Sequence, residues 1–360
     1  MRGGTSKGIY LDRKHLPADP AEWGPIFRGI MGSPDPHSRQ LNGMGGGISS
    51  LSKICVVGPP ASVSDGYDIE YTFVQVGVDD GVLDFSGNCG NLATAVGVFA
   101  LDEKMIRVPS LEMIPGEDNT RRKKATIKLR NTNTNKTIRT TFPVSLNTGL
   151  ALLVDPDIEV AGVSGKGSRV VLEFMDPAGA KTGKLLPTGK PTDTIPIEGH
   201  GSFEVSCVDA TNPTVFANGV DFAGTPDETL LPLLELIRQA AAVRMGLDQT
   251  SQAQPKICLV WPASGREGCD VVARALSMGV WHKAIPSTVG LCLAAAAGID
   301  GTIVQRVGEF KGPDDLGTLD VKFGIVGGVV GVRTRIVAGE IKSVGIERTA
   351  RRLMRGEVFW

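Results

Sequence analysis

The sequence is short of the features that mark several large classes of protein. Its 38 lysines and arginines are offset by 39 aspartates and glutamates, so no basic excess predicts nucleic-acid binding. No uncharged apolar run is long enough for a membrane span or a signal peptide. We therefore expect a cytoplasmic protein without nucleic-acid or membrane partners, and 360 residues are enough for two domains with cores of their own.

Cysteine and histidine are also sparse and poorly spaced for metal binding. The six cysteines include no Cys-x-x-Cys pair, and Cys55, Cys258 and Cys292 lie inside apolar runs, as buried free thiols do. Disulfides and zinc are therefore disfavoured. The start "MRGGTSKG" lacks the GxxxxGK[ST] spacing of a phosphate-binding loop, which argues against nucleotide binding.

What the sequence does contain is an internal repeat. Three pairs of segments align without gaps and in the same order. The aligned segments are 5–13 with 211–219, 52–59 with 255–262, and 89–102 with 287–300. These alignments match Ser6 with Asn212, Lys53 with Lys256, and Cys89 with Ser287. The ordered triplet predicts two structurally similar halves.

The pattern within each half is typical of an α+β fold. Segments rich in β-branched residues predict strands at 8–12, 52–58, 67–85, 122–132 and 136–142. Residues 90–101 and 288–299 are apolar nearly all round, which predicts one helix per half enclosed by protein. We therefore expect strands wrapped around one buried helix in each half, with residues 225–246 forming an outer helix.

A stretch rich in glycine, proline and threonine at 176–194 marks the domain boundary. We expect one domain over residues 1–185 and a second over 186–345. The ending 346–360 has no counterpart closing the first half, and we expect it to return to the first domain.

The sequence "GNCGN" at 87–91 opens the first buried helix with a cysteine between two Gly-Asn pairs. A helix start leaves backbone N–H groups unpaired and carries partial positive charge, so it favours anions and the thiolate form of a cysteine. The alternative is an ordinary turn with Cys89 as a small buried filler. Packing alone does not require two Gly-Asn pairs, so we favour a functional Cys89.

Lys53 lies where a polar, glycine-rich loop meets the apolar strand that begins at Ile54. A solvated surface lysine is the alternative interpretation. A lysine partly removed from water loses affinity for its proton, however, and can act as a base near neutral pH. Lys256 has the same setting, so the position belongs to the fold and only one copy need be catalytic.

With these residues in view, the sequence resembles the PrpF family, the 2-methylaconitate cis–trans isomerases, which share the diaminopimelate epimerase fold. The resemblance runs over essentially the whole chain. The matching motifs are "MRGGTSKG", "MGSPDP", "NGMGGG", "SSLSK", "FSGNCGN", "SMGVWHKAIPST", "GIDGT" and "RTARRLMRGEV". It implies two similar domains, each a β-barrel-like sheet around a central helix, an active site in the interdomain cleft, and no cofactor.

The resemblance also implies that Lys53 and Cys89 are the acid/base pair. Epimerases of this superfamily use two cysteines, and Ser287 at the second helix start makes a lysine-based proton transfer the better fit. The substrate class is then an unsaturated di- or tricarboxylate of the aconitate or 2-methylaconitate type, isomerised through a dienolate. One substrate carboxylate is expected to bind Ser6, Gly90 and Asn91. A second carboxylate is expected to bind Asn212, Ser287 and Thr288.

Several alternatives stay open at this point. His282 is consistent with either a substrate contact or a structural role. The reaction is either a cis–trans change or a double-bond shift, and a 4-oxalomesaconate-type tautomerase is an alternative. An accessory protein of an aconitase-like iron–sulfur enzyme is another, although a binding module needs no acid/base pair. A homodimer is compatible with the sequence.

The absence of ligand-spaced cysteines and histidines predicts that the isomerase activity implied by the resemblance survives exhaustive treatment with EDTA. Ultraviolet absorbance of an unsaturated tricarboxylate, followed before and after chelation, measures this. Activity that disappears and is restored by one added metal would favour Lewis-acid catalysis over a proton shuttle.

Overall fold

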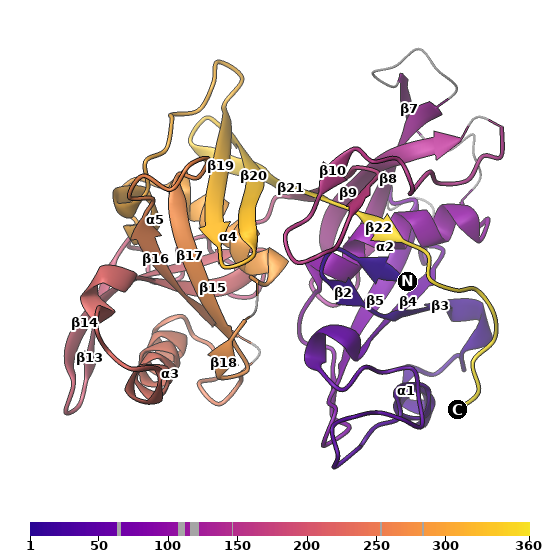
Figure 1. Cartoon of the computed structure of the whole chain (residues 1–360), viewed down its shortest axis with the longest axis horizontal. Coiled ribbons are helices and arrows are strands. Elements are labelled where there is room, and N and C mark those ends of the chain that lie inside the picture. The colour runs from indigo at the N-terminus through magenta and orange to yellow at the C-terminus, as the bar shows by residue number, and fades with distance from the viewer. Residues whose placement is uncertain (63–65, 107–111, 116–121, 146, 253, 283) are drawn as a thin grey trace. The chain divides into compact units, whose positions relative to one another are not determined.

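Both halves of the chain build mixed α/β structure, in a computed structural model that describes residues 1–62, 66–106, 112–115, 122–145, 147–252, 254–282 and 284–360 (Figure 1). The chain divides into two units. The first is Met1–Glu173 together with Glu347–Trp360, and the second is Phe174–Ile346.

The first unit contains helices α1 (Trp23–Met31) and α2 (Gly90–Asp102) and short 3₁₀ turns at Arg13–His15, Pro20–Glu22 and Ser49–Leu51. Its strands are β1 (Arg2–Gly3), β2 (Ser6–Lys7), β3 (Ile9–Asp12), β4 (Lys53–Gly58), β5 (Ile69–Val76), β6 (Leu83–Asp84), β7 (Glu112–Pro115), β8 (Arg122–Asn131), β9 (Lys136–Ser145), β10 (Ile158–Glu159), β11 (Lys166–Gly167), β12 (Val170–Met175, which continues into the second unit) and β22 (Ala350–Arg351).

The second unit contains helices α3 (Asp227–Arg244), α4 (Ser287–Ala297) and α5 (Ile303–Val307) and a 3₁₀ turn at Gly219–Phe222. Its strands are β13 (Asp193–Ile197), β14 (Gly201–Ala210), β15 (Asn212–Asn218), β16 (Lys256–Pro262), β17 (Val271–Ser277), β18 (Val280–Trp281), β19 (Thr318–Ile325), β20 (Gly328–Val337) and β21 (Glu340–Arg348, which ends in the first unit). The strand and helix segments predicted from the sequence coincide with β3, β4, β5 and β6, β8, β9, α2, α3 and α4.

Strand pairing follows the same order in the two units. In the first, β3 is parallel to β4, β4 is antiparallel to β5, and β5 is parallel to β8, which pairs with β9. In the second, β15 is parallel to β16, β16 is antiparallel to β17, and β17 is parallel to β19, which pairs with β20. The sequence repeat therefore corresponds to a repeated strand order.

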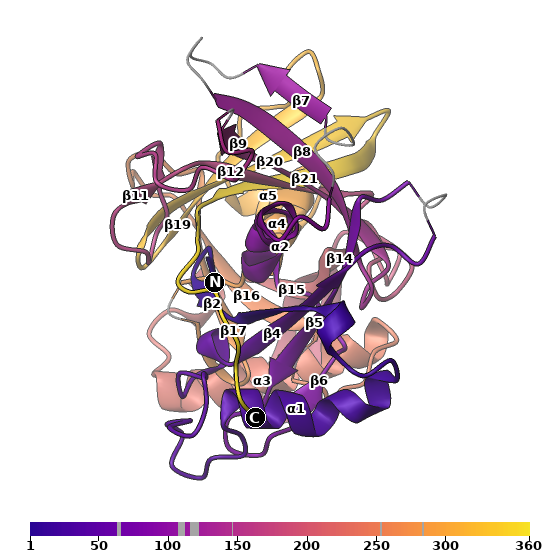
Figure 2. The same ribbon diagram turned by 90° about the vertical axis from the view of Figure 1, so that its right-hand side faces the viewer.

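Helices α1 and α2 lie on opposite faces of strands β4 and β5 (Figure 2). Side chains alternate between the faces of a strand, so Ile54 and Val56 pack with Val74, Val76 and the apolar side of α1 in one cluster. The same alternation directs Lys53 and Cys55 to the other face, where α2 lies. Helix α1 was not predicted, because Gly24, Pro25 and Gly29 weaken its helical signal.

Helix α2 is buried from Gly90 to Leu101. It contacts strands β1, β2, β4, β5, β8, β9 and β22. An α-helix that is apolar all round has no face for water, so contacts with protein on several sides stabilise it. In the second unit α4 is likewise buried from Ser287 to Ala297, while α3 packs its leucines against β13 to β17.

The division between the units falls at Glu173 and Phe174 rather than near residue 185. Hydrogen bonds explain the difference. The backbone N–H of Asp176 donates to the Lys342 carbonyl at 2.9 Å, and that of Gly179 donates to the Asp209 carbonyl at 2.8 Å. These bonds attach the start of the Gly/Pro-rich stretch to the second unit.

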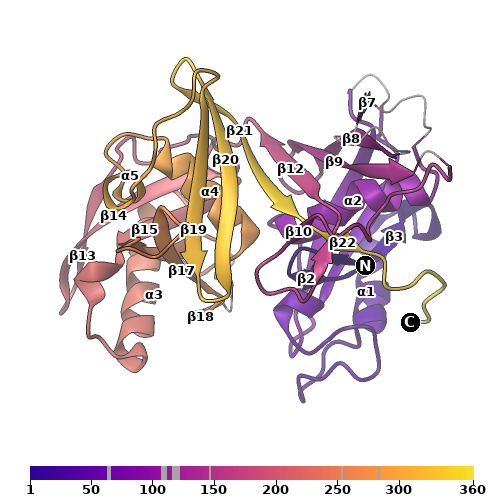
Figure 3. The same cartoon turned by 45° about the horizontal axis from the view of Figure 1, so that its top comes forward.

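The C-terminal segment 347–360 belongs to the first unit. Its strand β22 pairs antiparallel with β1. Figure 3 shows β22 in the yellow end of the chain. Further along, Arg352 forms ion pairs with Asp102 and Glu103 at the end of α2. The segment therefore follows α2 from its first turn to its last.

Strand β1 lies so close to the first turn of α2 that only glycine fits at residue 3. A methyl group on Gly3 would lie 2.2 Å from the backbone carbonyl oxygen of Asn91. We expect Gly3→Ala to lower the free energy of unfolding by about 1–3 kcal/mol, because backbone must move to admit the methyl. Urea unfolding measures this.

Gly331 in β20 provides the matched control, since a methyl there meets nothing within 4 Å. We expect Gly331→Ala to change stability by less than about 0.5 kcal/mol. Equal unfolding midpoints for the two variants would contradict the close approach of β1 to α2.

Candidate functional site

Lys53 is the first residue of β4 and is buried with only 9% of its surface exposed. Its ammonium donates a hydrogen bond to Oε1 of Gln75, which lies directly opposite on β5, and lies 5.2 Å from the ring centroid of Phe73. The sequence predicted partial burial of this lysine at the edge of the core. The structure adds that its partner is an uncharged amide oxygen.

Burial lowers the pKa of Lys53 from its ordinary value. Three groups act in the opposite direction, namely Cys89, Cys55 and Asp84, and their effect on the pKa of Lys53 is the smaller one. A lysine in this setting releases its proton at lower pH than a surface lysine does. Cys89 and Lys53 are thus within electrostatic range of each other.

Cys89 occupies the N-cap position of α2 in an extended conformation and is half-buried. Its backbone carbonyl accepts from the N–H of Ala93 at 2.9 Å, while its side chain forms no capping bond to the helix. The thiol is therefore not used to cap the helix. It lies beside the N–H groups of the first turn, where negative charge is stabilised.

Two side chains shape the turn that carries Cys89. The hydroxyl of buried Tyr71 donates to Oδ1 of Asn88 at 2.8 Å, and the carboxylate of Asp84 accepts from the N–H of Ser86 at 2.7 Å. Burial raises the pKa of Tyr71 well above its usual range, so its hydroxyl keeps the donated proton. These bonds fix the path of the chain on both sides of Gly87.

Asn91 in the first turn of α2 is tied to the β1–β2 hairpin. Its Nδ2 donates to Thr5 Oγ1 at 2.9 Å and to Ser6 Oγ at 3.5 Å. Ser6 and Asn91, both predicted substrate-binding residues, are thus brought together with Gly90 at the start of α2. Buried Arg348 lies nearby, because a methyl on Gly4 would touch both the Asn91 side chain and Arg348 Cδ. Burial lowers the pKa of Arg348 to about 10, so it is cationic at neutral pH.

The remaining predicted site residues belong to the second unit. Ser287 and Thr288 are buried in the first turn of α4. The hydroxyl of Thr211 donates to the Thr288 carbonyl at 3.0 Å, which brings its neighbour Asn212 to the same end of the helix. His282 accepts at Nδ1 from the Ala284 N–H at 3.1 Å, so it shapes the turn that leads to α4.

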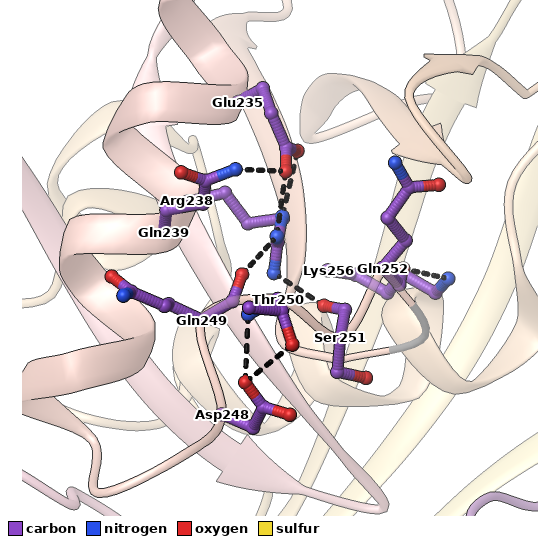
Figure 4. A network of polar contacts seen from close by, with 9 residues as sticks. All are labelled: Glu235, Arg238, Gln239, Asp248, Gln249, Thr250, Ser251, Gln252 and Lys256. Atoms are coloured by element: carbon purple, nitrogen blue, oxygen red, sulfur yellow. Dashed lines mark hydrogen bonds and ion pairs between the residues drawn. The ribbon is translucent and has the colours of Figure 1, made fainter.

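Lys256, the repeat partner of Lys53, has different surroundings (Figure 4). It is half-buried, and its ammonium donates to the Gln252 carbonyl at 3.2 Å and to Ser277 Oγ at 3.5 Å. The loop that carries Gln252 is held by buried Arg238, which donates to the carbonyls of Gln249 and Ser251. The contacts of Lys256 therefore stabilise a loop.

Strand register shows which polar residues differ between the two copies. Ile9 pairs with Ile54 in the first unit and Val215 with Ile257 in the second, as the repeat aligns them. Where the first copy has Tyr71, Gln75 and Asp84, the second has Ala273, Ser277 and Val280. Only the first copy combines a buried lysine with this polar set.

Sequence reasoning missed Tyr71, Gln75 and Arg348. Tyr71 and Gln75 lie in a segment whose alternating pattern predicts a strand. That pattern does not show which other strand lies beside this one. The repeat contained a signal, since Gln75 and Tyr71 have no polar equivalents of similar size in the second half. Arg348 lies more than 250 residues from Lys53 in sequence, and only the return of the C-terminal segment brings it to α2.

Comparison with known proteins shows which family the chain belongs to. A family model described as "PrpF protein" matches residues 1–360. The chain belongs to the PrpF family. Among PrpF relatives, 3-methylitaconate isomerase of Eubacterium barkeri is 35% identical over 386 residues, covering 100% of this chain and 95% of the relative. A 2-methyl-aconitate isomerase of Shewanella oneidensis is 34% identical, covering 99% and 95%.

Solved structures agree on the fold. The crystal structure of a methylitaconate-delta-isomerase is 34% identical, with a TM-score of 0.78, over 99% of this chain and 93% of that one. A hydroxyproline epimerase from Agrobacterium vitis is 12% identical, with a TM-score of 0.50, over 92% and 78%. This PrpF protein therefore has an epimerase-like fold.

The described ranges of the chain also bear on metal binding and on membrane insertion. Within these ranges, no three histidine, cysteine or acidic side chains are grouped closely enough to hold a metal ion. None of the helices described here is both long and apolar enough to span a bilayer.

The lowered pKa of Lys53 makes stability depend on pH. Between that lowered pKa and about 10.4, the usual pKa of lysine, the unfolded chain binds more protons than the folded one. Burial of the ammonium therefore destabilises the folded state fully below the lowered pKa. This destabilisation decreases as the pH rises toward about 10.4. We expect the free energy of unfolding of Lys53→Met, taken relative to that of the wild type, to be higher at pH 7 than at pH 10. Urea unfolding at several pH values measures the difference.

Lys256→Met is the matched control at the equivalent strand start. Because Lys256 is more exposed, we expect a smaller change with pH. Parallel curves of unfolding free energy against pH for Lys53→Met and the wild type would contradict the assignment of a destabilised ammonium.

Proposed function

We propose that this PrpF protein is a cofactor-independent isomerase that moves a proton on an unsaturated tricarboxylate of the aconitate or 2-methylaconitate type. One observation carries the proposal. A buried lysine with a lowered pKa lies within electrostatic range of a half-buried cysteine at a helix start. Two relatives of this chain are named 3-methylitaconate isomerase and 2-methyl-aconitate isomerase, after an unsaturated dicarboxylate and an unsaturated tricarboxylate.

Lys53 is the proposed base. Its free amine removes a proton from the carbon next to both the double bond and a carboxylate, so the C–H bond breaks and its electron pair spreads into a dienolate. Burial suits this role, because it lowers the pKa of Lys53 and so favours the free amine more than in a surface lysine.

Cys89 is the proposed partner that returns a proton. Protonation at the far carbon of the dienolate shifts the double bond, whereas rotation and protonation at the original carbon gives cis–trans isomerisation. The thiolate left behind then takes the proton held by the Lys53 ammonium, and the enzyme regains its starting form. No oxidant or second substrate is needed.

The dienolate carries extra negative charge on a carboxylate, which the start of α2 is suited to stabilise. The N–H groups of Gly90 and Asn91 together with the Ser6 hydroxyl are the proposed contacts. Arg348 is a fixed positive charge close to Asn91 and supports an anionic substrate there. Such donors act without rearrangement when the charge develops.

The roles of Asn212, Ser287 and Thr288 in binding a further carboxylate remain predictions from the sequence, and so does a substrate contact by His282. The finer description of the fold, a β-barrel-like sheet around a central helix in each unit, is supported by the burial of α2 and α4 and their strand contacts.

A tautomerase acting on an oxalomesaconate is the second candidate. The 4-oxalomesaconate tautomerase of Pseudomonas putida is 32% identical, covering 99% of this chain and 94% of the relative. The same proton shift serves both reactions. A substrate panel followed by proton NMR in D₂O, with cis-aconitate, trans-aconitate, 2-methylaconitate, methylitaconate and 4-oxalomesaconate, separates them by which acid exchanges its allylic proton.

Removal of the base and of its partner should have different effects. We expect Lys53→Ala to abolish both isomerisation and solvent deuterium exchange, because no dienolate forms without a base. Cys89→Ser keeps the size of the side chain but is a far weaker acid, so kcat should fall on the order of 10²-fold. Proton NMR in D₂O measures exchange and turnover together.

Lys256→Ala is the control, because it removes the equivalent lysine of the second unit. We expect it to retain turnover within about threefold of the wild type. Circular dichroism first establishes that each variant is folded. Undiminished exchange in folded Lys53→Ala would refute the base assignment, and inactivity of the wild type on the whole panel would favour the accessory-protein alternative.

A further inference from the structure

Gln75 lies in the middle of a row of side chains that crosses three strands. Lys53 on β4 is directly opposite Gln75 on β5, and Gln75 is directly opposite Asp84 on β6. Cross-strand neighbours of this kind are close enough for their side chains to interact. Gln75 therefore separates the proposed base from the nearest carboxylate in the row.

The orientation of the Gln75 amide is determined by its other contacts. Its Nε2 donates to the carbonyl oxygens of Ser52 at 2.9 Å and Ser49 at 3.1 Å. An amide nitrogen has hydrogens to donate to carbonyls and the amide oxygen has none, so Nε2 must face the loop before β4. Oε1 is then left facing the Lys53 ammonium, to which it is bonded.

The partner of Lys53 is therefore polar but uncharged. The other titratable groups around Lys53 are Cys89 at the start of α2, Cys55 on β4 and Asp84 on β6, and the Phe73 ring also contacts the ammonium. Burial raises the pKa of Cys55 well above its usual range, so this thiol is neutral. A glutamate in place of Gln75 would instead set a full negative charge against the ammonium.

The fold itself does not require glutamine here. Ser277 takes the equivalent place in the second unit, where Lys256 also bonds the Gln252 carbonyl. The same strand pair is built around a serine in that unit. The long amide of Gln75 is thus specific to the copy that carries the buried lysine and Cys89.

We propose that Gln75 is a positioning residue, which holds the Lys53 amine in one place through an uncharged oxygen and so leaves it able to act as a base. The geometric part of this inference stands alone, whereas its importance for turnover rests on the proposed function.

The test compares Gln75→Glu with the wild type by two measurements. Selective ¹⁵N labelling of lysine, with the Lys53 signal assigned by its loss in Lys53→Arg, gives the pKa of the Lys53 amine directly by NMR titration. We expect Gln75→Glu to raise that pKa by about one unit or more, because an opposite charge at contact distance favours the charged form. The acidic limb of log kcat/KM against pH should move upward equally.

Gln75→Met supplies a second, uncharged variant of similar length. It removes the acceptor, so we expect kcat to fall about tenfold or more with little change in KM, because the amine is no longer held in place. Its Lys53 pKa should stay at or below that of the wild type. This variant keeps the inference testable should Gln75→Glu not fold.

Ser277→Glu is the matched control, since it sets the same new charge opposite Lys256. We expect the Lys53 titration and the pH profile to be unchanged in this variant. An unshifted Lys53 pKa in folded Gln75→Glu, or full kcat in Gln75→Met, would overturn the positioning role. If the Lys53 pKa shifts in Gln75→Glu but the wild type is inactive on every acid of the panel, the contact between Gln75 and Lys53 is supported and the proposed function is refuted.

Discussion

A positive charge removed from water is the constraint around which the first unit is built. Burying an ammonium is costly, and the protein offsets this cost at Lys53 with one amide oxygen, an aromatic ring and the distant influence of Cys89 and Asp84. A carboxylate in place of the Gln75 amide would stabilise the Lys53 ammonium more strongly. It would therefore also raise the pKa of Lys53 and disfavour the free amine. An amide oxygen instead bonds the Lys53 side chain without adding a charge, as the proposed role of Lys53 as a base requires.

The two units share a repeated framework but differ in the polar residues placed on it. Both copies have the parallel strand pair, a lysine as the first residue of the second strand in that pair, and the buried helix. Only the first keeps the polar row and the tyrosine that orients Asn88. The fold accommodates this difference, because apolar side chains fill the inward faces of both sheets. The polar residues at the strand ends can therefore differ without disturbing the core.

Much of the fold was predictable, for identifiable reasons. Strands such as β4 and β8 carry β-branched residues between turn residues, and α2 and α4 are apolar on every side, so short-range patterns predict them well. Helix α1 was missed because its two glycines conceal the pattern. The reason for Gly29 lies outside the helix, where the backbone of Trp360 packs against it. The division between the units lies about a dozen residues before the boundary expected from composition, where backbone hydrogen bonds attach Asp176 to β21 and Gly179 to β14.

By itself the sequence determined the repeat, the pairing of Lys53 with Cys89 as candidate acid and base, and the helix start beside them, since these depend on local pattern and on motifs. Only the tertiary structure decided what lies beside Lys53 and beside the start of α2. Strand register sets Gln75 opposite Lys53. Tyr71 bonds Asn88 just before α2, and Arg348 comes from the far end of the chain to lie near Asn91. Register and chain return depend on the packing of segments distant in sequence, which local pattern does not encode.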